Sequence, residues 1–82
     1  MNNLINEFNK IFRWPKKLSD KDIITKWLSL KFDFDIQYSE KQVNTILDKY
    51  HLFNDSALLR RELISRKYLG RESDGSQYWR VK

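Results

Sequence analysis

The chain has 82 residues and therefore forms one small domain, which excludes a deep catalytic cleft between domains. A domain of this size buries only about 60 to 65% of the surface that its unfolded form exposes. Its hydrophobic content of 40%, with three Trp, four Tyr and five Phe, excludes a disordered chain, and the lack of Cys excludes disulfides, thiolate metal sites and cysteine nucleophiles. Sixteen basic against eleven acidic residues give a net charge of +5, which favours an anionic partner, most simply nucleic acid.

The first twelve residues have neither the basic start nor the unbroken apolar stretch of a signal peptide. No part of the sequence approaches the roughly 20 consecutive apolar residues of a membrane span. We therefore expect a cytoplasmic protein that does not enter a membrane.

An amphipathic helix is predicted over residues 2–12, because apolar side chains recur there at helical spacing. The apolar stripe consists of Leu4, Ile5, Phe8, Ile11 and Phe12. Pro15 stops this helix, and residues 13–18 are expected to connect it to the rest of the chain. The stripe is expected to pack either on its own domain or on a second copy of the chain, so these five residues are also the predicted contact of a homodimer.

A second helix is predicted from Ser19 or Asp20, either of which can cap it, to about Phe32. Its predicted apolar face consists of Ile23, Ile24, Trp27, Leu28 and Leu30. Residues 33–38 then alternate polar and apolar side chains, and this period of two predicts a short strand. Through Ile36, that strand is expected to pair with the edge of a hairpin further along the chain.

The run Ser39-Glu40-Lys41-Gln42 has the form of a capping box and predicts a third helix that ends near Tyr50. Residues 51–54 should form a turn, after which Asn54 or Asp55 caps a fourth helix over 55–66. The side chains expected to face inward are Val43, Ile46, Leu47 and Tyr50 in the third helix and Leu59, Leu63 and Ile64 in the fourth.

Asp74-Gly75 separates two stretches of strand-forming residues, 69–73 and 76–81, and is a strong signal for a tight hairpin turn. The resulting order of helix, short strand, helix, turn, helix and hairpin is that of a winged helix-turn-helix. We therefore predict a mainly α fold with a small β-sheet (α+β). An extra N-terminal helix and connector (1–18) precede a winged helix-turn-helix domain (19–82).

The predicted helix over 55–66 is the candidate recognition helix. Counting 100° per residue puts Ala57, Arg61 and Ser65 opposite its buried face, and such a small, hydroxylated surface with one arginine fits a DNA major groove. Arg61 can donate two hydrogen bonds to a guanine edge or reach a phosphate. With phosphate contacts from the hairpin and the preceding helix start, the predicted nucleic-acid contacts are Lys41, Ser56, Ala57, Arg61, Ser65, Arg71, Ser73 and Ser76.

Arg60 lies on the inner side of the same helix, beside Leu59 and Leu63. We predict that its guanidinium is partly buried and paired with a carboxylate, that of Asp55 or Asp74. The aromatic pair Tyr78-Trp79 is expected to pack in the core and on the strand edge instead of stacking on bases.

No cofactor, metal site or catalytic group is predicted. Gly70 and Gly75 mimic half a phosphate loop, but the lysine of that loop is missing and a strand follows instead of a helix. His51 is the only histidine and has no Ser, Cys or second His at a meaningful spacing, so neither a triad nor a zinc site can form around it. We expect His51 to be a turn residue and the protein not to be an enzyme.

Three blocks of the sequence together resemble a known family. They run from Tyr38 to Leu47 (Tyr-Ser-Glu-Lys-Gln-Val-Asn-x-Ile-Leu), from Asp55 to Ile64 (Asp-x-x-x-Leu-Arg-Arg-Glu-Leu-Ile) and from Leu69 to Trp79 (Leu-x-Arg-x-x-Asp-Gly-x-x-Tyr-Trp), with Trp14-Pro15-Lys16-Lys17 ahead of them. In this order they resemble a prokaryotic domain of unknown function that occurs alone or at the C-terminal end of helix-turn-helix transcriptional regulators.

The resemblance extends over about residues 14–80 and implies a winged-helix-like shape and, through that shape, nucleic-acid binding. Gly70 departs from the family's pattern and should leave a weak spot in the first hairpin strand. The predicted function is DNA binding in transcriptional regulation. The alternative is a protein-interaction module on the same scaffold, because Leu58 on the outward face is unusual for a groove and Glu62 would repel phosphates.

Overall fold

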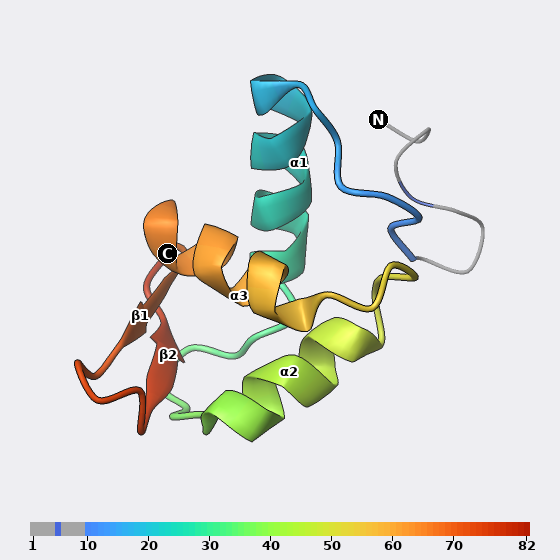
Figure 1. Cartoon of the computed structure of the whole chain (residues 1–82). Helices are drawn as coiled ribbons and strands as arrows, with labels where there is room; N and C mark the ends of the chain where they lie inside the picture. The colour runs from blue at the N-terminus through green and yellow to red at the C-terminus, as the bar shows by residue number, and fades with distance from the viewer. Residues whose placement is uncertain (1–4, 6–9) are drawn as a thin grey trace.

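The computed structural model of the protein describes Ile5 and residues 10–82 (Figure 1). This part of the chain forms three helices and a two-stranded antiparallel sheet, so the fold is α+β as predicted. The elements are α1 (Leu18–Ser29), α2 (Glu40–Asp48), α3 (Ser56–Ser65), β1 (Leu69–Arg71) and β2 (Tyr78–Arg80). Figure 1 shows α3 between α1 and α2, with the hairpin of β1 and β2 beside the C-terminal end of α3.

Local side-chain caps define the starts of α2 and α3. Ser39 caps α2 by accepting from the amide of Gln42 at 3.1 Å, and the Gln42 side chain accepts from the amide of Ser39 at 2.8 Å, which confirms the predicted capping box. Asp55 caps α3 by accepting from the amide of Leu58 at 3.0 Å, as predicted. The start of α1 differs from the prediction, because the helix begins at Leu18 and no side chain caps it.

The core lies where the three helices and the hairpin meet. Each helix contributes residues spaced four apart, the spacing that keeps apolar side chains on one face. The buried hydrophobic residues are Ile11, Ile24, Leu28, Phe32, Val43, Leu47, Leu59, Leu63, Leu69 and Tyr78. Of the helices in the described part, the longest has 12 residues, and none is long and apolar enough to cross a bilayer.

The helix predicted over residues 2–12 is wrong wherever the structure describes these residues. Ile5 and Ile11 form an antiparallel bridge, and Ile11 forms a parallel bridge with His51. The turn before α3 supplies the backbone partners, since the amide of Ile11 donates to the carbonyl of Tyr50 at 2.7 Å and its carbonyl accepts from Leu52 at 2.9 Å. Ile5 and Ile11 therefore pack on the chain's own domain.

The predicted homodimer contact changes accordingly. Ile11 is fully buried, and Ile5, which is half-buried, packs against the same core. Phe12 is 41% exposed, and Leu4 and Phe8 lie outside the described residues. The apolar stripe thus serves the chain's own core through at least two of its five members.

The strand predicted over residues 33–38 is reduced to one residue. Tyr38 exchanges two backbone hydrogen bonds of 2.8 Å with Tyr78, whereas Ile36 is 43% exposed and does not pair. Asp35 has a φ of 66°, a left-handed conformation that breaks an extended strand. Tyr38 anchors the loop by packing edge-on against Phe32, with ring centroids 5.3 Å apart.

The hairpin pairs Leu69 with Arg80 and Gly70 with Trp79. Gly75, with a φ of 76°, turns the chain within a connection longer than a two-residue turn, which is closed by a hydrogen bond from Glu72 to Gln77. A Cβ on Gly70 would lie 2.6 Å from Nε1 of Trp79. Gly70 is therefore the residue that lets the indole lie against the strand.

Candidate nucleic-acid interface

A cleft of about 330 Å³ lies between α3, the hairpin and the first turn of α2. It brings together three of the predicted contact residues, Arg61 and Ser65 from α3 and Arg71 from β1. The other residues that line it are Glu40, Arg60, Ile64 and Tyr78. This cleft is the candidate nucleic-acid interface.

The amphipathic pattern of α3 explains why Arg61 and Ser65 reach the cleft. Leu59 and Leu63 are fully buried on the core side, while Arg61 and Ser65 are exposed one turn apart on another side of the helix. Arg71 comes from a separate element, at the end of β1 opposite Tyr78. Helical spacing could predict the first two residues, but only the folded chain brings Arg71 beside them.

Arg60 is partly buried, with a side chain 16% exposed, and it has a carboxylate partner as predicted. The partner is different from the two that were expected. Arg60 donates to Oδ1 of Asn44 at 2.5 Å and its Nη2 lies 3.9 Å from Oε1 of Glu40. The expected pairing with Asp55 or Asp74 is therefore wrong, and α2 holds this guanidinium.

Asp55 and Asp74 are occupied locally. Asp55 caps α3, and Asp74 accepts from the amide of Ser76 at 2.9 Å inside the hairpin connection. The hydrogen bonds from the Ser76 side chain and amide favour the charged carboxylate and lower the pKa of Asp74 below its ordinary value. Both carboxylates thus shape the backbone within three residues of themselves.

Arg61 and Arg71 remain the available cations of the cleft. Both side chains are exposed, and neither forms an ion pair or a hydrogen bond with another described residue. Glu40, the one carboxylate that lines the cleft, is bound by Arg60 and accepts from the hydroxyl of Tyr78 at 3.3 Å. The cleft therefore presents two uncompensated guanidinium groups to solvent.

The structure does not bring the other predicted contact residues into the cleft. Ser56 donates to Asp48 and closes the turn between α2 and α3, and Ala57 beside it is half-buried. Lys41 is exposed in a separate shallow groove on α2. The remaining two, Ser73 and Ser76, are exposed in the hairpin connection.

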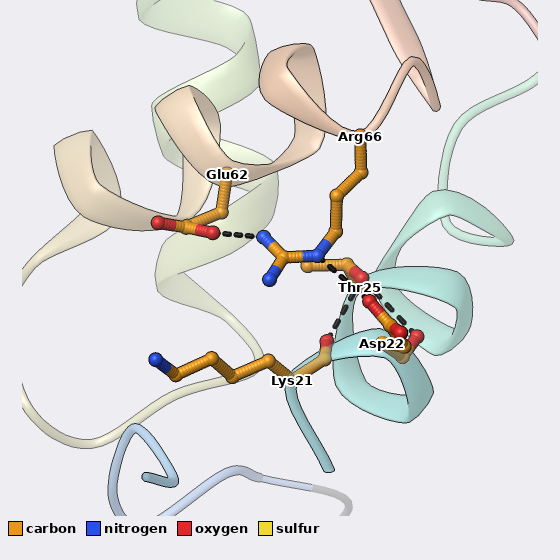
Figure 2. A network of polar contacts seen from close by, with 5 residues as sticks. All are labelled: Lys21, Asp22, Thr25, Glu62 and Arg66. Carbon is orange, nitrogen blue, oxygen red and sulfur yellow. Dashed lines mark hydrogen bonds and ion pairs between the residues drawn. The ribbon is translucent and has the colours of Figure 1, made fainter. Parts of the chain in front are cut away.

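Sequence reasoning missed a polar network that joins α3 to α1 (Figure 2). Arg66 donates through Nε to Asp22 at 2.9 Å and through Nη1 to Glu62. Burial disfavours the charged guanidinium, but the hydrogen bonds and charges of the two carboxylates outweigh burial and raise the pKa of Arg66. The spacing of Glu62 and Arg66 is a helical ion-pair signal, whereas nothing local points to Asp22.

His51 has a structural place. It is 5% exposed, and its Nδ1 lies 2.8 Å from the carbonyl of Leu47 while its Nε2 accepts from the amide of Asp55 at 2.9 Å. It therefore ties the end of α2 to the cap of α3, in the turn where it was predicted. Within Ile5 and residues 10–82, no three His, Asp or Glu side chains are grouped closely enough to hold a metal ion.

Comparison with known proteins places the chain in a family. No curated protein and no solved structure matches the chain. One family model does, and it extends over residues 10–80, from the segment that contains the buried Ile11 to the end of the hairpin. The chain therefore belongs to the family described as "Uncharacterized protein conserved in bacteria (DUF2087)".

Proposed function

We propose that this protein is a winged-helix DNA-binding protein that acts in transcriptional regulation without catalysing a reaction. The order of α1, α2, α3 and the hairpin supports the proposal, and Tyr38 supplies the short third strand through its bridge to Tyr78. In this arrangement α3 enters the major groove and the hairpin over 69–81 is the wing.

The observation that carries the proposal is the shared position of Arg61 and Arg71 in one cleft. Arg61 lies on the exposed side of α3, where its guanidinium can donate two hydrogen bonds to a guanine edge or to a phosphate. Arg71 lies on the hairpin, where it can bind the phosphate backbone beside the groove. A helix and a wing that each present a free arginine to the same space suit a duplex that contacts both.

We assign further phosphate contacts to exposed residues outside the cleft. Lys41 is exposed in the first turn of α2, and Ser73 and Ser76 are exposed in the hairpin connection. Ser65 adds a hydroxyl beside Arg61. Ser56 contributes less than its position in the sequence suggests, because its hydroxyl is bound to Asp48.

Two carboxylates near the interface, those of Glu62 and Glu40, are paired with cations. Glu62, which the sequence alone presents as a group that would repel phosphates, is bound by Arg66. Glu40 is bound by Arg60 and Tyr78. Since a paired carboxylate repels an approaching phosphate less than a free one, the positive charges of Arg61 and Arg71 dominate the cleft.

Fluorescence anisotropy with a labelled duplex over a series of salt concentrations tests the proposal. We expect binding that weakens steeply with salt, because phosphate contacts release counterions. Arg61→Ala should weaken binding by about 1 to 3 kcal/mol and reduce the salt slope by about one if the contact is to a phosphate. The matched control is Arg13→Ala, which removes the same charge at an exposed position outside the cleft. Absence of binding at low salt, or equal affinities of wild type and Arg61→Ala, contradicts the proposal.

A protein-interaction module is the second candidate, and one feature of the surface favours it. Phe34 and Ile36 are 51% and 43% exposed in the loop before α2, and Ile36 and Trp79 line a second cavity of about 450 Å³. Exposed apolar side chains grouped in this way are typical of protein contacts. The same titrations separate the two functions, since association through these residues would be insensitive to salt and to Arg61→Ala.

A further inference from the structure

The space between α3 and the hairpin is concave. The cleft lies beside the exposed side of α3 and is bounded by three elements of the fold. Its volume of about 330 Å³ falls at the lower end of small-molecule pockets, which measure roughly 300 to 1,000 Å³. The cleft therefore has the dimensions of a site for a small ligand.

The charges in the cleft favour a dianion. Arg60 is balanced by Glu40, so the free charges are those of Arg61 and Arg71. A phosphate monoester carries about −1.5 to −2 charges at pH 7, whereas a phosphodiester in a DNA backbone carries only one. Two free guanidinium groups therefore match the terminal phosphate of a small molecule better than they match a single backbone phosphate.

The cleft also offers apolar surface beside these cations. Ile64 of α3 and the ring of Tyr78 line it, and the Tyr78 hydroxyl is already bound to Glu40 at 3.3 Å. Ligand pockets combine apolar walls with a few polar groups that orient the ligand. An organic group attached to the phosphate can pack against these two side chains while the arginines hold the phosphate.

We propose that the cleft binds a small phosphate monoester, with the phosphate between Arg61 and Arg71 and the organic part against Ile64 and Tyr78. This ligand goes beyond DNA as a partner, and its binding does not depend on DNA binding. Nucleoside monophosphates and sugar phosphates both carry the required group, and they differ in the ring that the apolar walls would contact.

Calorimetric titration of the full chain at low salt tests the proposal with matched probes. Phenyl phosphate is a monoester with an aromatic ring, methyl phenyl phosphate is the corresponding diester, and inorganic phosphate lacks the organic part. We expect phenyl phosphate to bind about tenfold more tightly than either of the other two, because only it satisfies both the arginines and the apolar walls. Parallel titrations with adenosine monophosphate and ribose phosphate then distinguish the two natural sources.

Variants assign the binding to the cleft. Arg61→Ala and Arg71→Ala should each weaken phenyl phosphate binding by about tenfold, and Arg13→Ala should leave it unchanged. Both cleft arginines are exposed, so these variants should stay folded, which thermal unfolding would verify. The proposal fails if the monoester does not bind, if monoester and diester bind equally, or if Arg13→Ala weakens binding as much as the cleft variants do. Because no DNA is present, this result is independent of the anisotropy experiment.

Discussion

Two regions that share α3 use arginine in opposite ways. At the junction of α1 and α3, the Arg66 side chain is 18% exposed and is bound to Asp22 and Glu62 (Figure 2). At the cleft between α3 and the hairpin, Arg61 and Arg71 are exposed and have no carboxylate partner among the described residues. The difference depends on which carboxylates the fold brings within reach. Residue type alone therefore does not distinguish an arginine that holds the fold from one that is free to bind.

The junction and the cleft also differ in what they contribute to stability. Across the described residues, no buried side-chain nitrogen or oxygen lacks a hydrogen-bond partner, so the interior is satisfied. The cleft instead brings together Arg61 and Arg71, whose like charges do not stabilise the folded state. An anion that pairs with them would add stability to the folded state, which is why this region is the better candidate for binding.

The largest effect on stability is expected at His51, which is buried in the turn between α2 and α3. His51→Ala removes the hydrogen bonds to Leu47 and Asp55 and leaves a cavity between α2 and α3, so it should lower the free energy of unfolding by about 2 to 4 kcal/mol. Denaturant unfolding measures this loss. Leu52→Ala is the matched control, since this neighbouring side chain is 55% exposed and its removal should change stability by less than about 0.5 kcal/mol. Equal stability of the two variants would show that His51 does not tie the helices together.

Smaller effects are expected for two alanine variants that compare the paired Arg66 with the unpaired Arg61. Arg66→Ala should lower the free energy of unfolding by about 1 to 2 kcal/mol, a value reduced by the exposure of Asp22, and it should leave DNA affinity nearly unchanged. Arg61→Ala should do the reverse, with a loss of affinity and a change in stability below about 0.5 kcal/mol. Denaturant unfolding measures the stability of both variants, and fluorescence anisotropy measures their DNA affinity. A loss of stability with Arg61→Ala equal to that with Arg66→Ala would remove the distinction.

The parts of the fold that could be predicted are those set by nearby residues. The caps at Ser39 and Asp55 each involve an amide three residues away, and the inward faces of α2 and α3 follow from helical spacing. Arg61 and Ser65 of the cleft follow from the same spacing. The contacts of Arg60 with Asn44 and of Arg66 with Asp22 could not be predicted, because these partners lie 16 and 44 residues away in the sequence and meet the arginines only after folding.

Two wrong predictions came from patterns that have more than one structural solution. Alternation through Phe34, Ile36 and Tyr38 suits a strand, but the left-handed backbone at Asp35 leaves only Tyr38 paired. The apolar spacing that includes Ile5 and Ile11 suits a helix, but the described residues form bridges because the turn at His51 offers backbone partners. In both segments, tertiary contacts decided between local alternatives of similar propensity.

The smallest effect on stability is expected at Asp74, an exposed carboxylate in the connection between β1 and β2. Its pKa is lowered in the folded chain because it accepts hydrogen bonds from the Ser76 side chain and amide. Because the pKa is lowered, the charged carboxylate stabilises the folded hairpin at pH values above 3.8, the ordinary pKa of the group. This stabilisation is lost as the pH falls through the lower pKa of the folded chain.

NMR titration should therefore show the Ser76 amide shifting with a midpoint below that of an unstructured peptide containing the same residues. Asp74→Asn should abolish the titration of the Ser76 amide. The free energy of unfolding should hardly change, because the carboxylate is exposed and its hydrogen bonds compete with water. A midpoint at or above the peptide's would mean that the turn gains nothing from the charged form. In that case, only the junction of α1 and α3, where Arg66 binds Asp22 and Glu62, would be stabilised by charge, and the hairpin would not be.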